Sequence, residues 1–289
     1  MILRPALLVP LLVSALAGAG APAAPLGEPQ IYKETGGRAL RAYVVRPEGW
    51  HPSDRRPAIV FFHGGGWVGG SPTQFDGQAR HFATRGLVCI QIEYRLLPRQ
   101  GSEPPVTCIQ DARTAMRWVR RQASRLGIDP ERIAAAGGSA GGHLAAHTGL
   151  VDGTDDPQDD RSVSARPNAL LLFNPVLDNG PGGWGTARVR DRYPEWSPAH
   201  NVSRDDPPAI VFLGTQDALI PVATLEKFKT AMTAAGVRCD LHLYEGEPHG
   251  FFNASRSDGK YYRLTLLEAD RFLGSLGWLQ GKPTLESIR

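Results

Sequence analysis

The stretch that decides the fold is "RIAAAGGSAGGHLAAHTGL", residues 132–150. It opens with the apolar run Ile133-Ala134-Ala135-Ala136, which is typical of a strand buried on both faces. It closes with the helical pattern of residues 141–150, and Ser139 stands among glycines between the two. A flexible linker is the alternative, but Gly/Ser linkers do not usually join a strand pattern to a helix pattern. The stretch therefore predicts a strand, a tight turn that carries Ser139, and a helix.

The turn itself, residues 137–141, matches the pattern G-x-S-x-G, in which a serine hydroxyl is exposed on a sharp strand-to-helix turn. Glycines two positions before and two positions after the serine remove side chains that would clash in such a turn. The helix that follows points its N–H groups and its positive dipole end at the turn, which favours a developing oxyanion. The pattern alone is weak evidence, but its place between a buried strand and a helix is the one the motif requires.

Apolar runs of the same kind alternate with helical patterns along the chain. The runs are residues 58–63, 87–94, 132–137, 169–174, 209–214 and 239–244, and the helical patterns are residues 73–85, 105–127, 141–150, 221–236 and 260–277. Before them, "IYKE" and "RAYVVRP" predict a hairpin across "TGGRAL". This alternation predicts an α/β fold with a mostly parallel central sheet and helices on both faces.

Length and composition favour one globular domain. The chain has 289 residues, of which 42% are hydrophobic and 21% are charged, so it can bury a full core. The net charge of +3 is spread without a dense Lys/Arg block, so no nucleic-acid partner is expected. Residues 178–208 are rich in Gly, Pro, Asp and Trp and predict a small loop-rich cap. We expect a single domain over residues 25–289 that carries this cap.

The first 24 residues have the form of a signal peptide. Arg4 supplies a short positive region, residues 6–16 an apolar region, and residues 17–21 small-x-small cleavage patterns. An uncleaved anchor is the alternative, but the apolar run is short for a span of about 20 residues. We expect export, to the periplasm or the medium, and no stable membrane anchor after cleavage.

The chain has three cysteines, Cys89, Cys108 and Cys239. An odd and sparse set is not a disulfide framework, and their spacing is not that of a metal site. Each is expected to be a small buried hydrophobe, with a single bridge left open for an oxidising compartment.

A second glycine cluster, "HGGGW" at residues 63–67, ends the first buried strand. Glycines let the backbone approach a reacting group, so their N–H groups can serve as oxyanion donors. A flexible glycine loop is the alternative. His63 is expected to shape this loop rather than to accept a proton.

A serine nucleophile needs a base, and the base needs an orienting carboxylate. In the order that accompanies G-x-S-x-G, the acid and then the histidine follow the serine on loops after strands. Asp217 follows the run at residues 209–214, and His249 follows the run at residues 239–244. Asp178 follows the preceding run and is the alternative acid.

His143 and His147 lie four residues apart on the helix after Ser139. They could form a metal pair, but the Glu of an H-E-x-x-H motif is absent, so packing of the helix is the favoured explanation. No metal is expected.

Taken together, "HGGGW", "EYRL", "GGSAGGHLA", "GTQDALIP" and "HGF" stand in the order seen in α/β-hydrolase esterases. The chain resembles the branch related to hormone-sensitive lipase, and especially its bacterial acetyl-esterase and feruloyl-esterase-like members. The resemblance covers about residues 31–276. Hormone-sensitive-lipase relatives usually have Asp or Glu where Gly138 stands, and their acid motif also differs. Both departures favour the acetyl/feruloyl-esterase-like branch and weaken a lipid substrate.

The resemblance implies Ser139 as nucleophile, His249 as base and Asp217 as orienting acid, without any cofactor. It also implies oxyanion donors at the backbone N–H groups of Gly65, Gly66 and Ala140. The expected substrates are short-acyl esters, such as acetyl or feruloyl-type esters of carbohydrates, offered as small molecules or polysaccharides. Three tryptophans on loops near the expected pocket could stack on sugar rings or simply pack the cap, namely Trp67, Trp184 and Trp196.

Two other functions stay open at this point. A prolyl-oligopeptidase-like serine peptidase would share the catalytic domain, but such enzymes commonly have Tyr where Ala140 stands and carry a large propeller domain. A binding protein on an inactive hydrolase fold is the second alternative, although all three catalytic residue types are present.

Overall fold

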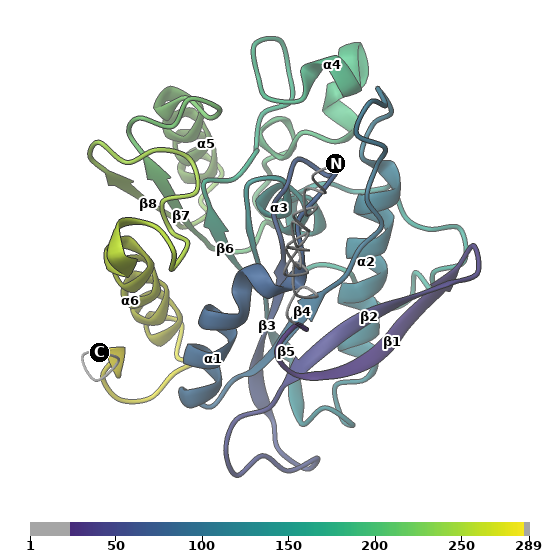
Figure 1. The fold of residues 1–289 in the computed structure, drawn as a ribbon, viewed down its shortest axis with the longest axis vertical. Helices are drawn as coiled ribbons and strands as arrows, with labels where there is room; N and C mark the ends of the chain where they lie inside the picture. Colours follow the sequence, from purple (N-terminus) through teal and green to yellow (C-terminus); the bar gives the residue numbers. More distant parts are fainter. Residues whose placement is uncertain (1–23, 286–289) are drawn as a thin grey trace, which may run out of the picture.

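A computed structural model describes residues 24–285 and shows one eight-stranded sheet (Figure 1). The strand order is β1-β2-β4-β3-β5-β6-β7-β8. Only β1–β2 and β2–β4 pair antiparallel, and the other neighbours pair parallel. The strands are β1 (Glu28–Thr35), β2 (Arg38–Val45), β3 (Arg56–Phe62), β4 (Val88–Ile92), β5 (Ile128–Gly138), β6 (Ala169–Phe173), β7 (Ala209–Gly214) and β8 (Cys239–Tyr244).

Helices cover both faces of the sheet, which confirms the predicted architecture. The α-helices are α1 (Asp76–Thr84), α2 (Val106–Arg121), α3 (Ala140–Leu150), α4 (Thr186–Val189), α5 (Val222–Ala234) and α6 (Lys260–Ser275). Short 3-10 helices are η1 (Pro72–Phe75), η2 (Arg190–Glu195), η3 (Pro198–His200) and η4 (Ser257–Gly259). Residues of α2, α3 and α5 pack into one core cluster and residues of α1 and α6 into another, on opposite faces of the sheet.

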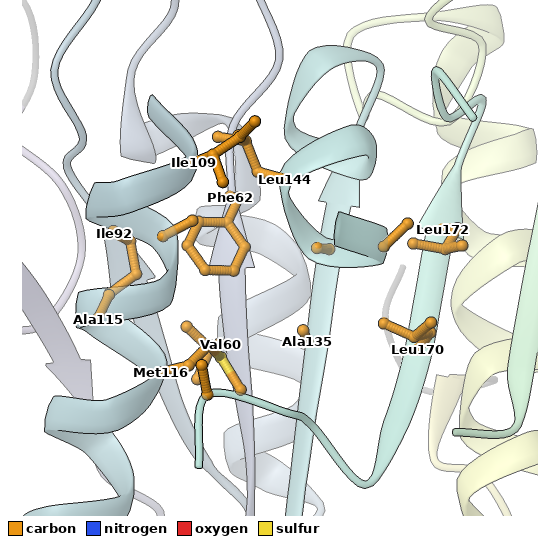
Figure 2. Close-up of a cluster of buried hydrophobic side chains, with 14 of the residues drawn as sticks. Val60, Phe62, Ile92, Ile109, Ala115, Met116, Ala135, Leu144, Leu170 and Leu172 are labelled. Carbon is orange, nitrogen blue, oxygen red and sulfur yellow. The ribbon is translucent and has the colours of Figure 1, made fainter. Parts of the chain in front are cut away.

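The core follows from the two-residue period of the strands. Val60 and Phe62 of β3 and Leu170 and Leu172 of β6 point to the same face, where they meet side chains of α2 and α3 (Figure 2). The residues between them, such as Phe61, point to the opposite cluster. Both faces of each central strand are therefore buried, as continuous apolar runs predict.

The predicted hairpin is confirmed and turns at Gly36 and Gly37, whose φ angles are 55° and 73°. Two consecutive residues with positive φ form the tight turn that suits a two-residue hairpin. The predicted helix at residues 105–127 ends earlier, at Arg121. The chain then turns back through Gly127, at φ 64°, whose carbonyl accepts a hydrogen bond from Arg56 N (2.9 Å) before β5 begins.

All three cysteines are free and buried, which confirms their role as small hydrophobes and excludes a bridge between them. The predicted signal peptide lies outside the described residues, apart from Ala24. Among residues 24–285, no helix is long and apolar enough to cross a membrane. The predicted cap, residues 178–208, contains α4, η2 and η3 between irregular loops.

Candidate active site

Ser139 occupies the turn between β5 and α3 in a strained backbone conformation, with φ 54° and ψ −121°. A non-glycine residue rarely adopts such angles, and it keeps them only where its surroundings enforce them. Here a Cβ on Gly137 would lie 2.2 Å from the carbonyl oxygen of Gly141, and a Cβ on Gly141 would lie 2.0 Å from that of Phe62. Both glycines are therefore required, and the half-buried Ser139 is held at the carboxyl end of β5.

His249 and Asp217 reach Ser139 from the neighbouring loops. His249 Nε2 lies 2.9 Å from Ser139 Oγ, and His249 Nδ1 lies 2.7 Å from Asp217 Oδ2. The Asp217 carboxylate is fully buried, and its other oxygen accepts hydrogen bonds from the backbone N–H groups of Leu219 (2.8 Å) and Ile220 (3.0 Å). A fixed carboxylate that accepts a hydrogen bond from Nδ1–H keeps the hydrogen on Nδ1 and leaves the Nε2 lone pair directed at the serine hydroxyl. The arrangement can thus remove a proton from Ser139.

The alternative acid, Asp178, lies elsewhere. Its Oδ1 accepts a hydrogen bond from Gly180 N (2.7 Å) and lies 3.9 Å from His200 Nδ1, so it closes the loop that follows β6. The structure therefore brings Asp217, and not Asp178, to His249.

The loop after β3 lies directly on this turn. A Cβ on Gly64 would lie 2.9 Å from the carbonyl oxygen of Gly138 and 3.4 Å from Ser139 Cβ. Gly65 and Gly66 have φ angles of 116° and 62°. Within residues 24–285, the backbone N–H groups of Gly65, Gly66 and Ala140 have no hydrogen-bond acceptor. These are the donors predicted for an oxyanion, and they are unengaged beside the serine.

His63 shapes this loop and is not placed as a base. Its Nδ1 donates to the carbonyl oxygen of Gly64 (2.8 Å), and its ring stacks on Tyr94 at 4.3 Å between centroids. Burial lowers the pKa of His63 to about 4, so the ring is neutral at neutral pH. The ring therefore serves as a fixed donor within the loop.

Two roles were left open for the three tryptophans, stacking on a sugar or packing the cap, and burial leaves only packing for two of them. Trp67 is 0% exposed and Trp196 is 2% exposed, so neither offers a ring face to a ligand. Trp67, at φ 64°, turns beneath the glycine loop and packs against His143. Trp184 is half-buried and lies with its ring 5.0 Å from that of Trp67. Of the three, Trp184 is the one with enough exposed surface to contact a ligand.

His143 and His147 are both fully buried on α3. His143 Nε2 lies 2.9 Å from the carbonyl oxygen of Trp196, which ties α3 to the cap. Burial lowers the pKa of His143 to about 4, and that of His147 falls well below its usual value. No group of three or more His, Cys, Asp or Glu side chains in the described part of the chain could hold a metal ion. The two residues fit helix packing, as favoured from the sequence.

Three amide side chains near the site escaped the sequence analysis. Asn174, at the end of β6, directs Nδ2 toward His249 Nε2 (3.4 Å) and accepts a hydrogen bond from Gly250 N (2.9 Å). Gln74 accepts a hydrogen bond from Gly64 N (2.7 Å), and Asn253 lies on the loop after His249. The position of Asn174 after a buried strand was a usable signal, whereas nothing in the sequence marks Gln74 or Asn253.

Gly138, where relatives usually have an acidic residue, is explained by packing. A Cβ at this position would lie 2.5 Å from Cζ of Phe252, a fully buried ring.

We expect Gly138→Ala to lower the free energy of unfolding by about 1–3 kcal/mol, because the Phe252 ring must shift in a filled core. Urea unfolding would measure the difference.

The matched control is Gly274→Ala in α6, because a Cβ at this position would have no heavy atom within 4 Å among its described non-local neighbours. It is expected to leave stability unchanged or to raise it. Adding Phe252→Leu to Gly138→Ala should recover part of the loss. If Gly138→Ala were as stable as the wild type, the packing explanation would be incorrect.

Comparison with known proteins identifies the family. The BD-FAE family model matches residues 49–179, and the Dienelactone hydrolase family model matches residues 187–270. Esterase LipC of Mycobacterium tuberculosis is 31% identical over 69% of this chain and 54% of its own length. The acetylxylan esterase of Xylanibacter ruminicola is 30% identical over 81% of this chain and 47% of its own. The chain thus spans about half the length of these curated relatives.

Among solved structures, esterase 2 of Thermogutta terrifontis in its apo form superposes with a TM-score of 0.86 at 43% identity. The match covers 90% of this chain and 98% of that one. The same esterase has been solved with propionate bound and after phosphorylation by paraoxon. The chain belongs to the α/β-hydrolase esterases, a family of carboxylic ester hydrolases, which confirms the resemblance inferred from its motifs.

Proposed function

We propose that this protein is a carboxylic ester hydrolase that uses Ser139, His249 and Asp217 for acyl transfer. The observation that carries the proposal is the hydrogen-bonded series from Asp217 Oδ2 through the His249 ring to Ser139 Oγ. Beside it are the backbone N–H groups of Gly65, Gly66 and Ala140, which have no hydrogen-bond acceptor among the described residues. The phosphorylation of a 43% identical esterase by paraoxon adds support for a covalent nucleophile.

In the proposed reaction, His249 Nε2 takes the hydroxyl proton while Ser139 Oγ bonds to the ester carbonyl carbon. The carbonyl oxygen becomes an oxyanion that accepts hydrogen bonds from the N–H groups of Gly65, Gly66 and Ala140. The bond to the leaving alcohol then breaks, and His249 returns the proton to that alcohol. Water, activated by His249 in the same way, releases the acid and restores Ser139.

The proposed substrates are short-acyl esters, with an acetyl group on a carbohydrate as the favoured example. The propionate-bound structure of the Thermogutta esterase supports a small acyl group. The acetylxylan esterase relative supports a carbohydrate as the alcohol. Trp184 is half-buried and lies close to Gly66, since a Cβ on Gly66 would be 3.4 Å from its ring. Its exposed part could contact such an alcohol. The signal-peptide pattern supports export of the protein to a compartment where it would encounter polysaccharide esters.

The test measures hydrolysis of p-nitrophenyl acetate, butyrate and octanoate, followed by release of acetate from acetylated xylan. We expect kcat/KM to fall steeply with chain length, because a site built for a small acyl group cannot bury the longer chain. A Pro-containing chromogenic peptide serves as the control substrate and should not be cleaved. Octanoate preferred over acetate would contradict the short-acyl proposal, and cleavage of the peptide alone would contradict ester hydrolysis.

A further inference from the structure

Two amide side chains join the loop that carries the oxyanion donors to the loop that carries the histidine. Gln74, in η1, accepts a hydrogen bond from the backbone N–H of Gly64 (2.7 Å) through Oε1. Its Nε2 donates to Asn253 Oδ1 (3.1 Å). Asn253 Nδ2 in turn donates to the carbonyl oxygen of Gly250 (2.8 Å), the residue after His249. We call this series the amide bridge.

The polarity of the amide bridge is fixed by the backbone groups at its two ends. The group of Gly64 that faces Gln74 is its backbone N–H, because its carbonyl oxygen is engaged by His63, so the Gln74 amide must present its oxygen to Gly64 and its NH₂ group to Asn253. Gly250 offers a carbonyl, so Asn253 must present its NH₂ group there and its oxygen to Gln74. One orientation of both amides therefore satisfies all three hydrogen bonds, and reversing either amide loses two of them.

Beyond Gly250 the series continues to the histidine itself. Gly250 N donates to Asn174 Oδ1 (2.9 Å), and Asn174 Nδ2 lies 3.4 Å from His249 Nε2. Asn174 is fully buried, and the hydrogen bond from Gly250 N holds its amide oxygen in place. The two loops are thus connected around the serine by side chains that come from three separate parts of the chain.

The amide bridge also determines which N–H groups are left for substrate. Gly64 N is engaged with Gln74, whereas Gly65 and Gly66 N are not engaged within the described residues. The hydrogen bond to Gly64 holds the peptide plane immediately before the two free donors. Because a displacement of about 1 Å at a reacting group can cost about 10²-fold in rate, the position of this plane matters for catalysis.

We propose that Gln74 and Asn253 are positioning residues that hold the Gly65 and Gly66 donors in register with His249. This inference rests on the proposed ester hydrolysis. Neither side chain touches the reacting atoms. They act through Gly64 at one end and Gly250 at the other, so that the donors and the base keep a fixed separation.

The experiment is a double-mutant cycle with Gln74→Ala, Asn253→Ala and the double variant, assayed on p-nitrophenyl acetate. Each single variant is expected to lower kcat by about 10- to 100-fold with KM changed by less than about threefold, because transition-state contacts are lost while ground-state binding stays. The double variant should be no slower than the slower single variant, since the two residues act as one unit. Gln74→Glu keeps the acceptor for Gly64 but loses the donor for Asn253, and is expected to behave like Gln74→Ala.

The matched control is Ser71→Ala, which removes the side-chain cap of the same short helix, η1, without touching the amide bridge. It should keep kcat within about twofold of the wild type. Three outcomes would each overturn the proposal in favour of a merely structural role. They are additive losses of kcat in the double variant, full activity of Gln74→Glu, and a loss of kcat in Ser71→Ala equal to that in Gln74→Ala.

A second measurement does not depend on turnover. Hydrogen exchange of the Gly64 amide, followed by NMR, should accelerate in Asn253→Ala as well as in Gln74→Ala, although Asn253 does not contact Gly64. Unchanged Gly64 exchange in Asn253→Ala would overturn the coupling between the loops. If wild-type protein hydrolysed no ester while Gly64 exchange responded as expected, the proposed function would fail and the amide bridge would stand.

Discussion

Replacing Ser139 by alanine is expected to lower kcat/KM for p-nitrophenyl acetate by at least about 10⁴-fold while the protein stays folded. Alanine removes the Oγ that lies 2.9 Å from His249 Nε2 and leaves the base without a nucleophile to activate. The glycine contacts that shape the turn do not involve Oγ, so the strained backbone is retained. The residual rate should reflect the backbone donors alone.

The control for this variant is Ser255→Ala, an exposed serine on the loop after His249. It should hydrolyse the ester at the wild-type rate. A fluorophosphonate probe should label the wild type and Ser255→Ala but not Ser139→Ala. Turnover or labelling that persisted in Ser139→Ala would show that another residue is the nucleophile.

The second large effect is expected for Asp217→Asn, with a fall in kcat of about 10⁴-fold at neutral pH. The reason is that Asp217 Oδ1, the oxygen that does not face His249, accepts hydrogen bonds from the backbone N–H groups of Leu219 and Ile220. An asparagine must place its own oxygen there, so its NH₂ group replaces Oδ2 at 2.7 Å from His249 Nδ1. His249 Nδ1 must then accept a hydrogen bond from this NH₂ group instead of donating one. Nε2 carries the hydrogen, and the ring cannot take the serine proton.

Asp178→Asn is the matched control, because Asp178 is the acid on the neighbouring loop and has no contact with His249. Its kcat should stay within about twofold of the wild type. NMR of the imidazole ring would show the changed tautomer in Asp217→Asn directly. Equal losses in the two variants would contradict the assignment of the acid.

The fold could be predicted from the sequence because its central strands are buried on both faces. Such strands are continuous apolar runs, and β7, which is buried along its whole length, matches the predicted residues 209–214. The edge strand β8 also matches its predicted residues 239–244, although most of its residues are only partly buried. Boundaries were less accurate where a turn, rather than the apolar pattern, ends an element. The pattern of α2 continued to Gly127, although the helix ends at Arg121.

In the candidate site too, some residues could be predicted from the sequence and others could not. Ser139, Asp217 and His249 could be placed from the sequence because each lies in the turn or loop that follows a recognisable strand. Parallel strands bring their carboxyl ends to one edge of the sheet. Gln74 and Asn253 could not be found, since 179 residues separate them and their contact depends on the path of two loops. The exposure of Trp67 and Trp196 could not be judged from the sequence. A loop position suggested exposure, but the positive φ of Trp67 turns its ring into the core.

Exchange of the cap is expected to change which esters are hydrolysed without altering the catalytic residues. Residues 178–208 follow β6 as one continuous segment, whereas the serine, the acid, the histidine and the glycine loop follow other strands. Among the contacts that hold the segment are the hydrogen bond from Ala199 N to the carbonyl oxygen of Leu177 (2.9 Å), the contact of the Trp196 carbonyl oxygen with His143, and the packing of Trp184 on Trp67. A transplanted segment that keeps these contacts is expected to bring a new alcohol preference from one family member to another.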